Sequence, residues 1–156
     1  MKPLHRSLII ALIALPGAAL AADSSPPMRA APRDPVLEQV AAATAKNDWG
    51  EAQATLRQAL ARNPDNADYH NLYAYSIRKG PNPDMSLVFK HYNEALRIDP
   101  KHRGAHEYLG EAYLMVGNVA KAKEQLGALD RLCFFGCSEF TDLKKAIAEH
   151  EKQATK

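Results

Sequence analysis

The alternation of apolar and polar positions between residues 106 and 122 predicts two helices joined by a tight turn. Apolar or small residues recur at spacings of three, four and seven, which places them on one face of a helix. These positions are His106, Leu109, Gly110 and Tyr113. The Gly-Asn pair at 117–118 ends this helix, and Ala122 begins the apolar face of the next. Gly110 and Ala122 are small enough to let two antiparallel helices approach closely.

A second pattern marks where helices end. Residues 59–64 (ALARNP) and 95–100 (ALRIDP) both begin with Ala-Leu and finish with Asn or Asp followed by Pro. Proline cannot continue a helix, and it forces the residue before it out of helical geometry. The two hexapeptides therefore predict the ends of two equivalent helices.

Together these features resemble the tetratricopeptide repeat (TPR), a helix–turn–helix unit, with His106 where the motif usually carries Trp. Alignment on the prolines gives three repeats, at about residues 33–66, 67–102 and 103–136. Extra residues in the second repeat fall in the turn at 79–84, where an insertion costs little. In the first repeat, helices are expected at about 35–46 and 49–62.

The end of the third repeat departs from the pattern, because residues 132–138 (LCFFGCS) stand where a terminating proline is due. An amphipathic helix follows at about 139–152, with Ser138 or Thr141 as its N-cap. A stack of helix pairs leaves its last apolar face exposed, so a capping helix is expected here. The predicted fold is all-α: an α-solenoid of three TPR-like helix pairs plus a C-terminal capping helix, in one domain at 35–153.

The N-terminal segment predicts export. Lys2 and Arg6 precede an unbroken apolar run at 8–15, and the small residues at 19–21 form a cleavage site, the order found in a secretory signal peptide at residues 1–21. The apolar run is shorter than the roughly 20 residues of a spanning helix, which argues against a retained membrane anchor. Residues 22–34 are rich in proline and predict a disordered linker. We expect a periplasmic or secreted protein without stable membrane insertion.

Removal of the signal peptide changes the charge balance of the chain. Two of its 20 Lys and Arg residues lie in that segment, and the remaining 18 match the 18 Asp and Glu residues. The mature chain is therefore near neutral and has no basic block, which argues against a nucleic-acid partner.

Cys133 and Cys137 are the two cysteines of the chain, four residues apart with Gly136 between them. In an exported protein such a pair favours a structural disulfide. Thioredoxin-like redox sites use a C-x-x-C motif beside a sheet, and neither is indicated here. A redox or soft-metal site at these residues is the alternative.

The sequence offers little for catalysis or metal binding. His102 and His106 have a spacing that can hold a metal on a helix, but no third ligand is evident nearby, and His106 and His70 fall on packing positions. Nucleophile-elbow and phosphate-loop motifs do not occur. We therefore expect no enzymatic activity, no cofactor and no metal.

The resemblance implies a concave groove, lined by the first helices of successive repeats, that holds a peptide or a partner helix. The positions that face this groove in the second and third repeats are Asn71, Tyr75, Arg78, Glu107, Glu111 and Leu114. Glu107 and Glu111 suggest a basic or amine-bearing ligand, with Arg78 neutralising one carboxylate when the groove is empty. An exposed glutamate pair without a binding role is the alternative for these two residues.

The sequence thus supports two functions of different class. The first is an exported TPR adaptor or scaffold that mediates protein–protein interaction through its groove. The second is a small periplasmic redox or metal-handling protein that uses Cys133, Cys137 and nearby histidines.

Overall fold

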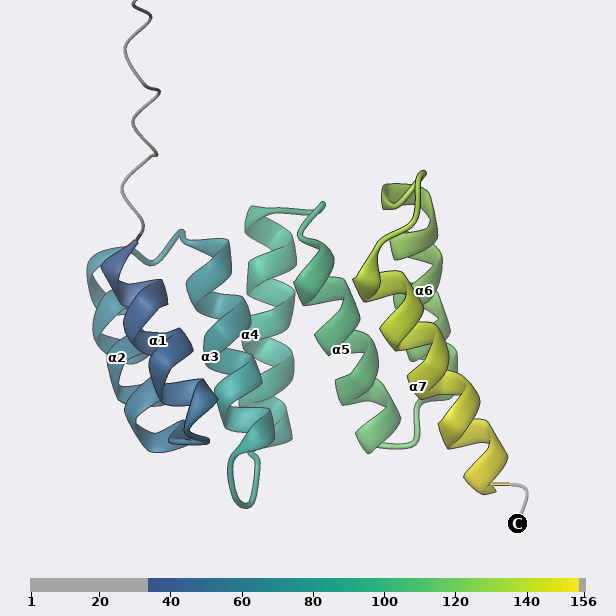
Figure 1. Cartoon of the computed structure of the whole chain (residues 1–156), viewed down its shortest axis with the longest axis horizontal. Helices are drawn as coiled ribbons and strands as arrows, with labels where there is room; N and C mark the ends of the chain where they lie inside the picture. Colours follow the sequence, from purple (N-terminus) through teal and green to yellow (C-terminus); the bar gives the residue numbers. More distant parts are fainter. Residues whose placement is uncertain (1–33, 155–156) are drawn as a thin grey trace, which may run out of the picture. The chain divides into compact units, whose positions relative to one another are not determined.

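The computed structural model describes residues 34–154, which form seven helices and no strand within that range (Figure 1). The helices are α1 (Pro35–Ala45), α2 (Trp49–Arg62), α3 (Ala67–Lys79), α4 (Met85–Ile98), α5 (Arg103–Met115), α6 (Val119–Leu132) and α7 (Ser138–Ala154). The expected signal peptide and all of the expected linker except Asp34 lie outside the described residues. None of these seven helices has the length and apolar character needed to cross a membrane.

Each of the first six helices begins at a side chain that accepts a hydrogen bond from a backbone N–H in the first helical turn. Such a cap satisfies one of the donors that the start of a helix leaves unpaired. The capping residues are Asp34, Asp48, Asn66, Asp84, His102 and Asn118. Asp34 also accepts a hydrogen bond from the hydroxyl of Tyr69 at 2.6 Å, so it belongs to the folded domain rather than to the linker.

The predicted cap of the last helix is wrong. Ser138 is already the first residue of α7, and Thr141 lies within its first turn. Cys137 occupies the capping position instead, because the backbone N–H of Phe140 points at its sulfur at 3.4 Å and that of Thr141 donates to its carbonyl. The cysteine pair therefore also sets where α7 starts.

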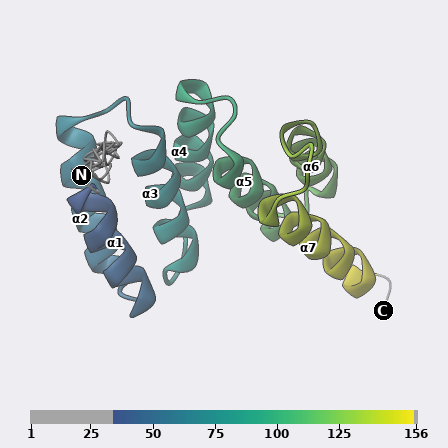
Figure 2. The same cartoon turned by 45° about the horizontal axis from the view of Figure 1, so that its top comes forward.

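The helices are arranged in two layers (Figure 1). Consecutive helices pack against one another, and α5 additionally contacts α3 and α7. The odd-numbered helices lie in front in Figure 1, with α2, α4 and α6 behind them. Figure 2 shows α5 between α4 on one side and α6 and α7 on the other. We call the surface formed by α3, α5 and α7 the inner face.

Small residues lie at the centre of the packed helix faces, where they are buried. They are Ala52, Ala59, Ala74, Ala95, Ala112 and Ala122. Larger side chains fill the spaces between them, and among these Leu56, Tyr92 and Leu109 are almost fully inaccessible. Tyr73 and Tyr92 also belong to the main core, and Tyr113 packs against it.

The close contact predicted at Gly110 is present, but its partner is α7 rather than α6. A Cβ atom added to Gly110 would lie 2.5 Å from Cδ2 and 2.7 Å from Cδ1 of Leu143, which is closer than carbon atoms can approach. Leu143 is itself fully buried in the second core cluster, with Leu129 and Ile147. Gly110 thus provides the surface on which the capping helix docks.

We predict that Gly110→Leu displaces α7 and lowers the free energy of unfolding by about 1–3 kcal/mol, the usual cost of overpacking. Thermal unfolding followed by circular dichroism measures the change. Gly50→Ala in α2 is the matched control, because its added Cβ would meet only the Asp48 side chain, at 3.7 Å. The control should melt at or above the wild-type temperature. Equal melting of the Gly110 variant and the wild type would contradict the contact.

Candidate functional site: the inner face of α3, α5 and α7

The six predicted groove residues come from two helices that lie side by side. Asn71, Tyr75 and Arg78 belong to α3, and Glu107, Glu111 and Leu114 belong to α5. Most of them are more buried than a groove residue is expected to be, since only Tyr75 and Glu111 keep an intermediate exposure. Whether they bind a partner stays a prediction.

Arg78 is the centre of this site. Its side chain is only 6 % exposed, and its Nη2 lies 2.7 Å from Oε2 of Glu111 on the next inner helix. The predicted ion pair between Arg78 and a groove carboxylate is therefore confirmed. From the other layer, the hydroxyl of Tyr92 accepts a hydrogen bond from Arg78 Nε at 3.2 Å. The guanidinium is thus held from both sides, and Glu111 is the partner that compensates its buried charge.

Two tyrosine rings flank the guanidinium. The Arg78 Cζ atom lies 5.6 Å from the ring centres of both Tyr75 and Tyr108, within the range of cation–π attraction. The two rings also contact each other, with centres 4.8 Å apart. Trp49 of α2 packs edge-on against Tyr75 at 6.0 Å, which extends the aromatic surface towards the first repeat. Trp49 and Tyr108 were not among the predicted groove residues.

Glu107 is not the solvated residue that the alternative reading of the glutamate pair would require. It is only 9 % exposed, and it forms no hydrogen bond or ion pair with any residue between 34 and 154. Burial, together with smaller effects of nearby carboxylates, raises the pKa of Glu107 to about 7, against an opposing effect of Arg78. These carboxylates are Glu111, Asp142 and Glu139. Near neutral pH, Glu107 is therefore a carboxyl group that would gain from a cationic partner.

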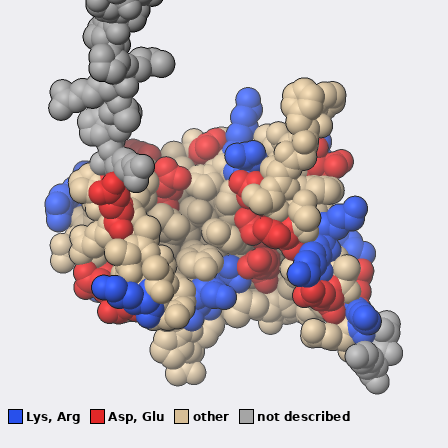
Figure 3. Space-filling view, in the orientation of Figure 1, with Lys and Arg blue, Asp and Glu red and all other residues tan. Residues whose placement is uncertain are grey.

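The acidic character of the site extends onto α7. We define the acidic cluster as Glu107, Glu111, Glu139 and Asp142. Figure 3 shows acidic side chains gathered over α5 and α7 on this face. Within the cluster, Glu111 is paired with Arg78, and Glu139 has a looser partner in Arg103, with 3.6 Å between Oε1 and Nε. The cluster therefore carries more negative charge than its basic neighbours balance.

Asn71 adds an unused acceptor to the same face. The residue is 5 % exposed, and its Oδ1 is buried without a hydrogen-bond partner among the described residues. The amide end of its side chain lies beside Gly104, one helical turn before Glu107 on α5. Buried polar atoms without partners are rare in folded proteins, so this oxygen is an unusual feature of the site.

The capping helix contributes to the site, which the sequence analysis did not foresee. Arg78, Glu111 and Leu114 line a pocket of about 290 Å³ together with residues of α7. Those residues include Ala146, Glu149 and His150. The sequence could have indicated this contribution, because α7 follows α6 as the first helix of a further repeat would. Its acidic residues therefore continue the inner face formed by α3 and α5.

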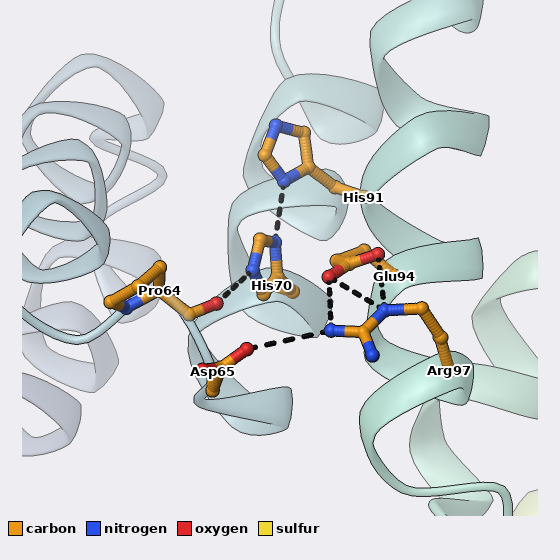
Figure 4. A network of polar contacts seen from close by, with 6 residues as sticks. All are labelled: Pro64, Asp65, His70, His91, Glu94 and Arg97. Atoms are coloured by element: carbon orange, nitrogen blue, oxygen red, sulfur yellow. Dashed lines mark hydrogen bonds and ion pairs between the residues drawn. The ribbon is translucent and has the colours of Figure 1, made fainter.

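A second polar network lies on the other side of α3 (Figure 4). His70 Nδ1 is 2.7 Å from His91 Nδ1 of α4, and His70 Nε2 is 2.8 Å from the carbonyl oxygen of Pro64. Since a carbonyl can only accept, His70 Nε2 carries a proton. With a single proton on its ring, His70 Nδ1 accepts from His91 Nδ1–H. Burial, with a smaller effect of His70, lowers the pKa of His91 to about 4.

The expected packing role of His70 fits this geometry, because its ring stacks on His91 with centres 5.0 Å apart. The partner, His91, was not singled out from the sequence. Nearby on the surface, Arg97 pairs with Glu94 at 2.8 Å and Asp65 at 3.4 Å. These exposed ion pairs add little stability.

The other histidines also have structural partners. The His102 ring accepts from the Ala105 N–H at 3.1 Å and meets Asp68, whereas the His106 ring contacts Gln125 and the Pro100 carbonyl. The rings of His102 and His106 thus have different hydrogen-bond partners. Across residues 34–154, three or more potential metal ligands do not come together at any point.

The sulfur atoms of Cys133 and Cys137 lie at disulfide-bonding distance, 2.05 Å, with their Cα atoms 5.6 Å apart. The bond closes the turn between α6 and α7. Whether it is only structural or also redox-active stays a prediction.

Comparison with known proteins supports the fold. No family model matches the chain. The TPR repeat-containing thioredoxin TTL4 of Arabidopsis thaliana is 28% identical over 101 residues, which are 64% of this chain but only 14% of that protein. Among solved structures, the TPR2B domain of yeast Sti1, in a complex described as TPR2B-domain:pHsp70, superposes with a TM-score of 0.66. It is 21% identical, and the match covers 76% of this chain and 94% of that domain.

The chain therefore has the tetratricopeptide repeat fold, as its sequence repeats predicted. The all-α solenoid architecture of paired helices is confirmed as well.

The raised pKa of Glu107 predicts a specific pH dependence. The folded protein holds a proton on Glu107 up to about pH 7, whereas the unfolded chain releases it near the ordinary value of 4.5. Glu107 therefore costs stability as pH rises through this window. Glu107→Gln should raise the melting temperature at pH 8 by a few degrees, on the order of 4 °C per kcal/mol, and change it little at pH 4. The control Glu124→Gln, on α6, should show no such difference. A Glu107 variant that shifts melting equally at both pH values would contradict this assignment.

His91 should act in the opposite direction. Its folded pKa of about 4 lies below the ordinary value of 6.5, so stability is lost as pH falls through that interval. His91→Gln keeps a donor for His70 and should reduce the loss measured by urea unfolding between pH 7 and pH 5. His150→Gln on α7 is the control outside this network. An unchanged pH slope in the His91 variant would show that the ring is not held neutral.

Proposed function

We propose that the chain is an exported, non-enzymatic adaptor that holds a basic segment of a partner polypeptide against the inner face. The observation that carries this proposal is the buried, unpaired Glu107 within the acidic cluster. A folded protein gains nothing from a desolvated carboxylate unless a partner compensates its charge. A Lys or Arg side chain, or a terminal amine, supplies both that charge and the N–H donors.

The arrangement of the site supports a polypeptide rather than a small ion. Tyr75, Tyr108 and Trp49 form an aromatic surface beside the acidic cluster, and aromatic residues are common anchors in protein interfaces. The solved Sti1 domain, which shares the fold, is described in a complex with pHsp70.

Export is supported by the pattern at residues 1–21 and by the cysteine pair. Disulfides persist in oxidising compartments such as the periplasm, and Cys133 and Cys137 lie at bonding distance. We therefore place the partner in the periplasm or outside the cell.

Binding of labelled peptides, measured by fluorescence anisotropy, tests this function. The probes are three peptides of equal length whose charged positions are all Lys and Arg, all Glu, or all Gln. The basic peptide should bind best, more tightly at pH 8 than at pH 6 because Glu107 loses its proton in between. Its affinity should fall as salt is raised, because exposed charges are screened within about 8–10 Å at physiological ionic strength.

Glu107→Gln should weaken binding of the basic peptide by about tenfold, the effect of roughly 1.4 kcal/mol. This variant is preferable to reversing the charges of Glu107 and Glu111, since Lys at position 111 would face Arg78 and disturb the fold. Glu124→Gln, whose carboxylate pairs with Lys121 on α6, is the matched control and should bind like the wild type. Equal binding of the acidic and basic peptides would contradict the proposal.

A further inference from the structure

The turn between α6 and α7 displays two unusually exposed aromatic rings. Phe134 is 87 % exposed and Phe135 is 97 % exposed, the two highest values among the large apolar residues of 34–154. Their ring centres are 5.0 Å apart and their planes are perpendicular, so the rings support each other without any cover from the rest of the domain. We call residues 133–137 the aromatic turn.

The aromatic turn is held rigid by three local devices. The bond between Cys133 and Cys137 closes it, and the Gly136 N–H donates to the Cys133 carbonyl at 2.8 Å. Gly136 itself has a φ of +84°, a conformation that other residues rarely adopt. A rigid display of apolar side chains reduces the entropy lost when they are buried by a partner.

A pocket that fits such rings lies beside the turn on the same chain. Its volume is about 300 Å³, roughly twice the ~150 Å³ cavity known to hold a benzene molecule. We call it the end pocket, and its lining residues are Lys123, Leu126, Gly127, Asp130 and Phe140. Asp130 and Phe140 each lie three residues from the aromatic turn, one on each of the two helices that the turn joins.

Gly127 is the second observation that points to an occupant of the end pocket. Glycine in the middle of a helix weakens the helix by about 1 kcal/mol relative to alanine, and a neighbour that a side chain would displace is one reason for such a glycine. No such reason lies within residues 34–154, because a Cβ on Gly127 would meet only Arg131 Nη1, at 3.8 Å. The missing side chain does keep the wall of the end pocket open.

We propose that the occupant is a second copy of this chain, in a two-fold symmetric dimer. In this dimer the aromatic turn of each protomer inserts into the end pocket of the other. A patch that contains both a projection and a matching recess is self-complementary, which is what a two-fold interface requires. The end pocket carries one charge of each sign, Lys123 and Asp130, and the aromatic turn carries none, so two copies meet without net repulsion.

The area available sets the strength of this dimer. Two phenylalanines from each copy, at about 200 Å² each, bury on the order of 800 Å², and the walls of the two end pockets add to this sum. Specific interfaces usually exceed about 1,000 Å² in total. The dimer is therefore near the lower limit, and it forms and separates with protein concentration.

Sedimentation velocity of the full protein, expressed for export and purified without reductant, tests the proposal. The wild type should pass from monomer to dimer over about a hundredfold range of concentration, as mass action requires. Phe134→Ser with Phe135→Ser removes four buried rings from the dimer and should weaken dimerisation by about 10,000-fold, since each buried ring is worth about a factor of ten. Gly127→Leu, which fills the end pocket, should weaken it similarly. The control Met115→Ser with Val116→Ser removes the other two large exposed apolar side chains and should leave dimerisation unchanged.

A mixing experiment distinguishes this dimer from non-specific hydrophobic association. The serine double variant keeps its end pocket and the Gly127 variant keeps its rings, so a mixture of the two should recover one of the two contacts. The mixture should dimerise more strongly than either variant alone. A wild type that stays monomeric, dimers that tolerate both variants, a mixture without recovery, or open-ended polymers would each overturn the proposal. A monomer that floats with phosphatidylcholine vesicles through its phenylalanines would overturn it too, and would assign the rings to a membrane surface.

Discussion

Close approach between neighbouring helices is the constraint on which the rest of this structure depends. Alanine or glycine stands where the helix faces pack, at Ala52, Ala74, Ala95, Gly110 and Ala122. These residues bring the helix backbones together, and the larger side chains then interlock around them at the density of a protein interior. The polar contacts of the inner face follow from this spacing, because it brings the side chains of α3, α5 and α7 close together.

The environment of Glu107 is the clearest result of that crowding. On an isolated helix its carboxylate would be solvated, and a second glutamate four residues away would cost only a few tenths of a kcal/mol. In the folded domain, α7 removes water and adds the charges of Glu139 and Asp142. Arg78 offsets only part of this effect on Glu107, since the guanidinium is paired with Glu111 and bonded to Tyr92. The site therefore carries an excess of negative charge that its own residues do not neutralise.

The sequence predicted those parts of the structure that local chemistry decides. Pro64, Pro100 and the capping side chains define helix ends, so the bounds expected for α2 agree with the structure. The ion pair of Arg78 could be predicted because the repeat alignment places α3 beside α5. What could not be predicted depends on tertiary packing. Gly110 meets Leu143 of α7, and the pKa of His91 is lowered by burial and by the neighbouring His70.

The chain of neighbouring contacts has a consequence for how the domain folds. Each helix touches the next, and beyond that only α3 with α5 and α5 with α7 make substantial contacts. Domains built from such short-range contacts have low contact order and fold quickly, and folding can proceed from one repeat to the next. The final helix is joined to the rest mainly through α5 and α6, so it is the element that can detach while the first two repeats stay formed. Partial unfolding would then begin at the aromatic turn, the end pocket and half of the acidic cluster together.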